Sequence, residues 1–185
     1  MKTVTIGPAG MRVSSIGLGC VTFGREIDEA AAHVLLDYTH AQGVCHFDTA
    51  AAYGDGASER ILGNWLASRR PAAGSVSIAT KILPPYEPAR IEESVERSLE
   101  RMAVPAIDLL YLHRWDATAE SPSAPAALHG LVQAGKIRVL GVSNFNMAQL
   151  AAALTLQEQN GLEPFRVVQN NHNLAVSDVG PEFRA

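Results

Sequence analysis

Several features that mark whole classes of protein are scarce in this sequence. It has only two cysteines, Cys20 and Cys45, too few for a disulfide framework and spaced unlike any zinc motif, so we expect both to be small buried side chains. Its 15 Lys and Arg residues are scattered and the net charge is −4, which predicts neither a polyanion-binding surface nor a nucleic-acid partner. No apolar run approaches the roughly 20 residues of a membrane span, and residues 1–10 lack the apolar segment of a signal peptide. These absences predict a protein of the reducing cytoplasm that contacts no membrane.

The composition itself is that of an ordinary globular protein, because 47% of the 185 residues are hydrophobic and 18% are charged, which suits a single domain spanning residues 1–185. Short apolar stretches alternate with longer amphipathic ones. The expected strands are 44–49, 75–81, 107–113, 137–142 and 165–170, and the expected helices are 28–42, 58–68, 88–102, 123–134 and 147–159. Strands that are apolar on both faces and alternate with helices are typical of a parallel α/β sheet.

The N-terminal segment differs from this alternation. Residues 2–6 alternate between polar and apolar side chains and are followed by a Gly-Pro-Ala-Gly turn, so we expect a β-hairpin within residues 1–13. Residues 11–20 are predicted to form a strand that runs into a glycine loop. Ser58 is predicted to be the N-cap of the helix that begins there.

Polar side chains gather where the expected strands end. In a parallel barrel all strand carboxyl ends lie on one face, where active sites are built. Packing alone does not require such residues at successive strand ends, so the pattern indicates a functional site. The residues are Asp48 and Tyr53 after the second strand, Lys81 after the third, His113 after the fourth, Ser143 and Asn144 after the fifth, and Gln169 in the sixth.

These residue types suit acid–base chemistry. A phenol ordinarily titrates near pH 10, and a neighbouring ammonium favours its ionised form, so Lys81 is expected to make Tyr53 a better acid–base group. A buried ammonium needs a carboxylate, for which Asp48 is the candidate. His113 could hydrogen-bond a substrate carbonyl oxygen. Ser143, Asn144 and Gln169 could hold a carboxamide through directional hydrogen bonds.

Four segments also resemble the signature motifs of the aldo-keto reductases. They occur in that family's order, and the resemblance covers about residues 17–173, nearly the whole chain. The segments are DTAAAYG followed by SERILG (48–54 and 58–63), IATK (78–81), DLLYLH (108–113) and GKIRVLGVSNF (135–145).

The resemblance implies a TIM-type (β/α)8 barrel, here with about six βα units after an N-terminal hairpin. It implies an NADPH-dependent oxidoreductase that reduces small aldehydes or ketones and uses no metal. Hydride would pass directly to the carbonyl carbon while Tyr53 protonates the oxygen, with Lys81 and Asp48 as its tuning pair and His113 orienting the substrate. Ser143, Asn144 and Gln169 would hold the nicotinamide carboxamide. By position, Phe23 and Trp115 would line the substrate pocket.

The sequence departs from the family because its last two βα units have no counterpart here. We therefore expect a fragment of a longer gene product. Six of eight barrel strands leave two open edges, through which the chain could also self-associate. No element is predicted for residues 177–185.

Two other functions remain open. The first is an inactive or regulatory nicotinamide-binding protein of the same family, although a pure sensor need not keep all four proposed catalytic residues. The second is a metal-dependent barrel hydrolase with His46, Asp48 and His113 as ligands, a set that lacks a recognisable further ligand.

Overall fold

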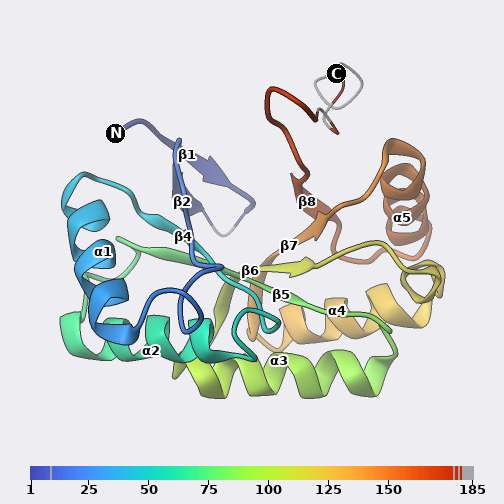
Figure 1. Ribbon diagram of the computed structural model, residues 1–185. Coiled ribbons are helices and arrows are strands. Elements are labelled where there is room, and N and C mark those ends of the chain that lie inside the picture. The colour runs from blue at the N-terminus through green and yellow to red at the C-terminus, as the bar shows by residue number, and fades with distance from the viewer. Residues whose placement is uncertain (9, 177, 179, 181–185) are drawn as a thin grey trace.

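Six parallel strands form one curled sheet in the computed structural model, which describes residues 1–8, 10–176, 178 and 180. Along the sheet the strands follow chain order, β3 to β8, and Figure 1 shows the helices around the outer side of the curl. The strands are β1 (Thr3–Ile6), β2 (Met11–Ser14), β3 (Leu18–Gly19), β4 (His46–Asp48), β5 (Ser77–Ile82), β6 (Ile107–Leu112), β7 (Ile137–Ser143) and β8 (Phe165–Gln169). The helices are α1 (Glu29–Ala41), α2 (Ala57–Arg69), α3 (Pro88–Met102), α4 (Ser123–Gln133) and α5 (Met147–Gln159), with a 3-10 turn η1 (Ala117–Glu120).

This architecture confirms the predicted incomplete (β/α) barrel with an N-terminal hairpin. Residues 177–185, for which no element was predicted, lie outside the described residues, apart from Asp178 and Gly180. Within the described part of the chain, no helix has both the length and the apolarity needed to cross a membrane.

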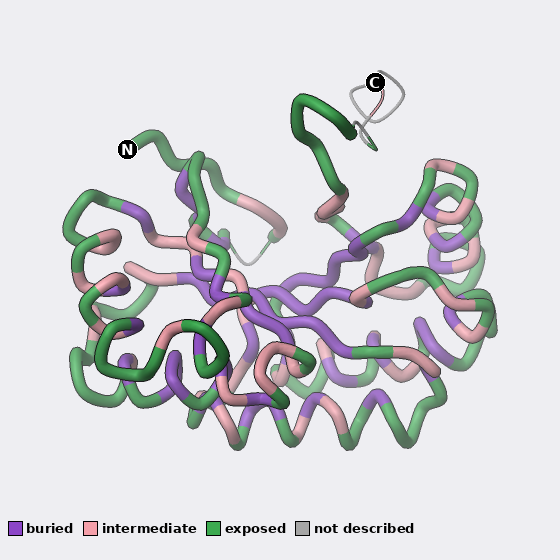
Figure 2. Tube along the Cα trace, in the orientation of Figure 1, coloured by how far each residue is buried: buried purple, intermediate pink, exposed green. Residues whose placement is uncertain are grey.

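The sheet is buried on both faces because its side chains alternate between two apolar clusters. In β5, Ile78 and Ile82 point outward into the large core shared with the helices, whereas Ala79 points inward to a smaller cluster. Met11 and Val13 of the hairpin complete that inner cluster. The buried strands appear as the purple centre of Figure 2.

The hairpin covers the end of the sheet where the strands begin. At that end the backbone N–H of Cys45, just before β4, donates to Ser14 Oγ over 3.0 Å. Apolar side chains therefore close the amino-terminal end of the concave face, and the carboxyl ends of the strands are left for polar groups.

Three local predictions were wrong. The strand predicted over 11–20 is divided, because β2 pairs with β1 while β3 pairs with β4. Ser58 is not the N-cap, since α2 begins at Ala57 and the fully buried Ser58 hydroxyl instead donates to the Cys20 carbonyl over 2.8 Å. Cys20 is buried as expected, but Cys45 is only half-buried.

Helices α2 and α3 approach closely at Gly63. A Cβ added there would lie 2.6 Å from the carbonyl oxygen of Met102 and 2.8 Å from that of Arg101, both backbone atoms that cannot move aside alone. Gly130, in the exposed middle of α4, has nothing within 4 Å of the same position. The two glycines are therefore a matched pair that separates helix propensity from packing.

We predict that Gly63→Ala lowers the free energy of unfolding by about 1–3 kcal/mol through overpacking. Gly130→Ala should raise it by about 0.5–1 kcal/mol, because alanine is the better helix former. Equilibrium denaturation in urea measures both. Equal effects of the two substitutions would show that the α2–α3 contact is looser than described.

Candidate active site

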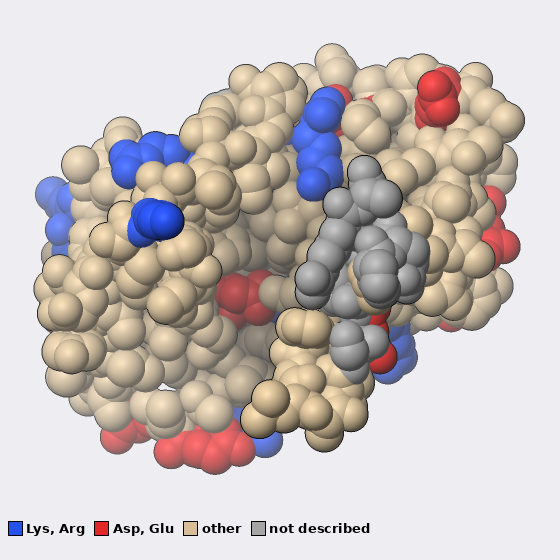
Figure 3. All heavy atoms as spheres, turned by 90° about the horizontal axis from the view of Figure 1, so that it is seen from above, with Lys and Arg blue, Asp and Glu red and all other residues tan. Residues whose placement is uncertain are grey.

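The predicted functional residues meet at the carboxyl ends of five neighbouring strands. Asp48 ends β4, Lys81 lies next to last in β5, and His113 directly follows β6. Ser143 ends β7 and lies in register with Gln169, which ends β8. Figure 3, seen from above the view of Figure 1, shows a surface hollowed in its middle, with an acidic side chain in the hollow.

The centre of this site is the ammonium group of Lys81, whose side chain is 1% exposed. It donates to Asp48 Oδ2 over 2.6 Å, to the carbonyl oxygen of Thr49 over 2.9 Å and to Tyr53 Oη over 3.4 Å. Each of its three protons thus has an acceptor, and its charge is balanced by the carboxylate. These conditions make a buried ammonium tolerable.

Tyr53 and His113 face each other across the mouth. Their ring centroids are 5.8 Å apart and the ring planes meet at 80°, an edge-to-face contact. Burial, followed by the Lys81 charge, lowers the pKa of His113 below its ordinary value of 6.5. A neutral imidazole at neutral pH offers one N–H donor and one acceptor, and His113 Nδ1 has no hydrogen-bond partner among the described residues.

Ser143 and Asn144 form a short polar edge beside this pair. The Asn144 amide nitrogen donates to the His113 carbonyl oxygen over 2.9 Å and to Ser143 Oγ over 3.0 Å. Asn144 has a φ of 57°, a left-handed conformation that asparagine tolerates better than most residues. Its backbone N–H donates to the Gln169 carbonyl oxygen over 3.0 Å, which joins the end of β8 to the same edge.

The two residues predicted for the substrate pocket are placed differently from the rest. Phe23 has no exposed surface and belongs to the core between sheet and helices, and its role as a pocket wall stays a prediction. Trp115 is 36% exposed, and its indole N–H donates to Glu120 in η1 over 3.3 Å. Their position along the chain suggested a pocket, but side-chain packing decides whether they can line one.

Three residues near the site have structural roles that the sequence did not predict. Thr49 accepts from Lys81 through its backbone carbonyl, for which side-chain identity carries no signal. Ser58 and Glu59 are fully buried although both are polar. They stand in the SERILG segment, so their position in a recognised motif was the signal that could have found them.

The hypothesised metal ligands do not assemble. His46 lies at the start of β4, where its Nδ1 is 3.0 Å from Ser77 Oγ, whereas His113 follows the end of β6. No group of three or more His, Cys, Asp or Glu side chains suited to a metal occurs among the described residues.

Comparison with known proteins gives one consistent family. The Aldo/keto reductase family profile matches residues 15–183. Norsolorinic acid reductase B of Aspergillus parasiticus is 35% identical over 92% of this chain and 50% of its own length. Aflatoxin B1 aldehyde reductase member 2 of Mus musculus is 34% identical over 90% of this chain and 46% of its own.

A solved structure agrees. The crystal structure of a thermostable aldo-keto reductase superposes with a TM-score of 0.85 at 26% identity, covering 99% of this chain and 66% of that one. The chain spans about half the length of the curated relatives that it matches.

We predict that the His113 imidazole titrates below pH 6.5, because burial and the nearby ammonium both disfavour its protonated form. Lys81→Met removes the second cause and should move the midpoint upward, whereas Lys136→Met, at a half-buried position directly before β7, should not. The Cε1 proton shift in an NMR titration, assigned with His113→Gln, measures the midpoint. A midpoint above 6.5 in the unaltered protein would contradict the description.

Proposed function

The chain belongs to the aldo/keto reductase family, and on that premise we propose that the protein reduces aldehydes and ketones to alcohols by direct hydride transfer from NADPH, with Tyr53 as general acid. The observation that carries this proposal is the buried Lys81 ammonium, hydrogen-bonded at once to Asp48 and to Tyr53. The chain spans about half the length of these relatives, and the activity of the whole protein is part of the proposal.

Tyr53 delivers the proton in this mechanism. When the carbonyl carbon is reduced, negative charge develops on the carbonyl oxygen, and the Tyr53 Oη–H bond breaks as the proton moves to that oxygen. The phenolate left behind faces the Lys81 ammonium over 3.4 Å, which stabilises it. Asp48 keeps that ammonium charged in its buried position.

His113 orients the substrate. Since its pKa is lowered, the imidazole is neutral at physiological pH and can donate one hydrogen bond to the carbonyl oxygen without competing with Tyr53 as an acid. The edge-to-face contact with the Tyr53 ring keeps the two donors close to each other at the mouth. A carbonyl oxygen between them would be positioned for protonation.

The residues at the mouth fit a nicotinamide cofactor. Asp48 Oδ1 and His113 Nδ1 at the mouth, like Ser75 Oγ before β5, are buried without hydrogen-bond partners among the described residues. The Ser143 hydroxyl proton and Asn144 Oδ1 complement the oxygen and amino group of a carboxamide, and Gln169 lies beside them. When bound, NADPH supplies the hydride.

The substrate belongs to the class of small carbonyl compounds. Two relatives are named for the reduction of norsolorinic acid and of aflatoxin B1 aldehyde, which makes both compounds reasonable members of a test panel. A cytoplasmic setting is part of the same proposal. It is consistent with the free thiols of Cys20 and Cys45, because the cytosol keeps thiols reduced.

Substitution of Lys81 tests the proposal. Lys81→Met removes the ammonium that stabilises the phenolate, and Tyr53→Phe removes the proton donor. Each should lower kcat for aldehyde reduction by about 100-fold or more, as is typical of a lost acid–base group. Lys136→Met, at a half-buried site far from the mouth, is the matched control and should keep the full rate. Stopped-flow measurement of NADPH oxidation follows the rate.

Two outcomes would contradict the proposal. Full turnover in Tyr53→Phe would mean that another group supplies the proton. NADPH binding without turnover of any carbonyl in the unaltered protein would favour the regulatory alternative.

A further inference from the structure

Glu59 is a buried carboxylate that the proposed mechanism does not use. Its side chain has no exposed surface. Oε1 accepts a hydrogen bond from the Thr80 hydroxyl over 2.6 Å, and Oε2 accepts one from Arg101 Nε over 2.5 Å. Burying a carboxylate costs free energy unless it is fully paired, so a residue of this kind calls for a structural or functional reason.

Both partners of Glu59 lie next to parts of the proposed active site. Thr80 directly precedes Lys81 in β5, so its side chain points to the outer face while Lys81 points to the inner one. Glu59 itself stands in the first turn of α2, directly after the loop that carries Tyr53. The Glu59–Thr80 hydrogen bond therefore joins the end of the Tyr53 loop to the strand that holds its partner.

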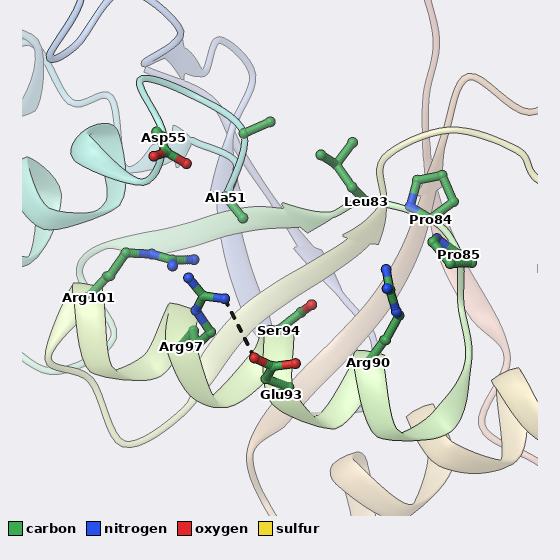
Figure 4. A pocket seen from close by; sticks show the side chains of 11 residues that line it. Ala51, Asp55, Leu83, Pro84, Pro85, Arg90, Glu93, Ser94, Arg97 and Arg101 are labelled. Carbon is green, nitrogen blue, oxygen red and sulfur yellow. Dashed lines mark ion pairs between the residues drawn. The ribbon is translucent and has the colours of Figure 1, made fainter.

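The loop between Tyr53 and α2 has a left-handed backbone and lies against α3. Gly54, Asp55 and Gly56 have successive φ values of 56°, 52° and 80°, a left-handed run in which Asp55 is the only residue with a side chain. The Arg101 side chain packs directly beneath the end of this run, since a Cβ on Gly56 would lie 2.7 Å from Arg101 Cδ. Figure 4 shows Arg101 reaching up from α3 toward the segment that bears Asp55.

The Arg101 pair differs from its neighbours on the same helix. A groove of about 520 Å³ lies between α3 and the loop that bears Asp55, and Arg101, Arg97 and Glu93 are among the residues that line it. Arg97 Nη1 and Glu93 Oε1 are 3.6 Å apart, and both side chains are more than half exposed. Such surface pairs are weak. Arg101 is only 17% exposed and donates through Nε to Glu59 and through Nη2 to Ser98 Oγ over 3.3 Å, so its guanidinium is held in place.

We propose that Glu59 is a positioning residue for the reaction. Through Arg101 and Thr80 it clamps the end of the Tyr53 loop to α3 and β5, and so keeps Tyr53 Oη 3.4 Å from Lys81 Nζ. This inference rests on the proposed function, because it assigns Glu59 to the Tyr53 proton transfer. Its effect is on geometry at the reacting atoms and not on binding of substrate or cofactor.

The test compares three variants of the whole protein. Each is assayed for reduction of a small aromatic aldehyde with NADPH. Glu59→Gln breaks the ion pair but can still accept from Thr80. The double variant Glu59→Gln with Arg101→Met also removes the unpaired guanidinium, so its thermal unfolding midpoint should recover most of what the single variant loses. Glu93→Gln is the matched control, because it makes the same chemical change in an exposed ion pair of α3, the helix that carries Arg101.

We expect kcat to fall about 10- to 100-fold in the single and double variants, since small displacements of reacting groups have effects of this size. KM for aldehyde and for NADPH should change by less than about twofold, because Ser143, Asn144 and Gln169 are untouched. Glu93→Gln should match the unaltered protein. If Glu59→Gln does not fold, the kcat and KM of the double variant alone test the inference.

A double variant with a recovered midpoint and a full kcat would overturn the inference, because the role of Glu59 would then be structural only. A loss confined to KM would overturn it as well. Tyr53→Phe, assayed in parallel, distinguishes failure of the proposed function from failure of the role given to Glu59. If Tyr53→Phe retains turnover, the proposed function fails. If it is inactive while the double variant is fully active, only the role of Glu59 fails.

Discussion

The fold is organised around one unfavourable group, the ammonium of Lys81 in a nearly water-free position. Such a charge is stable only with a carboxylate and enough acceptors around it, and these must come from elements other than its own strand. Asp48 supplies the charge from the neighbouring strand, and Thr49 and Tyr53 supply further oxygens from the loop that follows. The same contacts that satisfy the lysine bring a phenol beside it, so stability of the sheet and chemistry at its mouth share one set of hydrogen bonds.

The two ends of the sheet divide these tasks. At the amino-terminal end, the hairpin buries Met11 and Val13 against the concave face, and that end is apolar and closed. At the carboxyl end, the strands stop at polar residues, two of which, Asp48 and His113, keep buried atoms without partners among the described residues. A third such atom, Ser75 Oγ, lies before the start of β5, so it is the polar residues at successive strand ends that distinguish this mouth from the packed core.

Much of this arrangement could be predicted from the sequence. The bounds of α3 were predicted correctly because Pro88 begins it and its apolar positions recur at helical spacing. The meeting of Lys81 with Asp48 followed from topology, since carboxyl ends of adjacent parallel strands share one face. Ser58 was misread as a cap because its actual partners come from distant segments. The burial of Phe23 depends in the same way on packing that no local pattern records.

The reactivity of the lysines tests the central claim most directly. The chain has three lysines, Lys2, Lys81 and Lys136, and only Lys81 is buried. Under reductive methylation of the native protein, followed by peptide mass mapping, Lys2 and Lys136 should be modified while Lys81 stays protected until the protein is unfolded. Modification of Lys81 at the rate of the other two would contradict the account, because an accessible ammonium could not be the paired centre on which the sheet and the site depend.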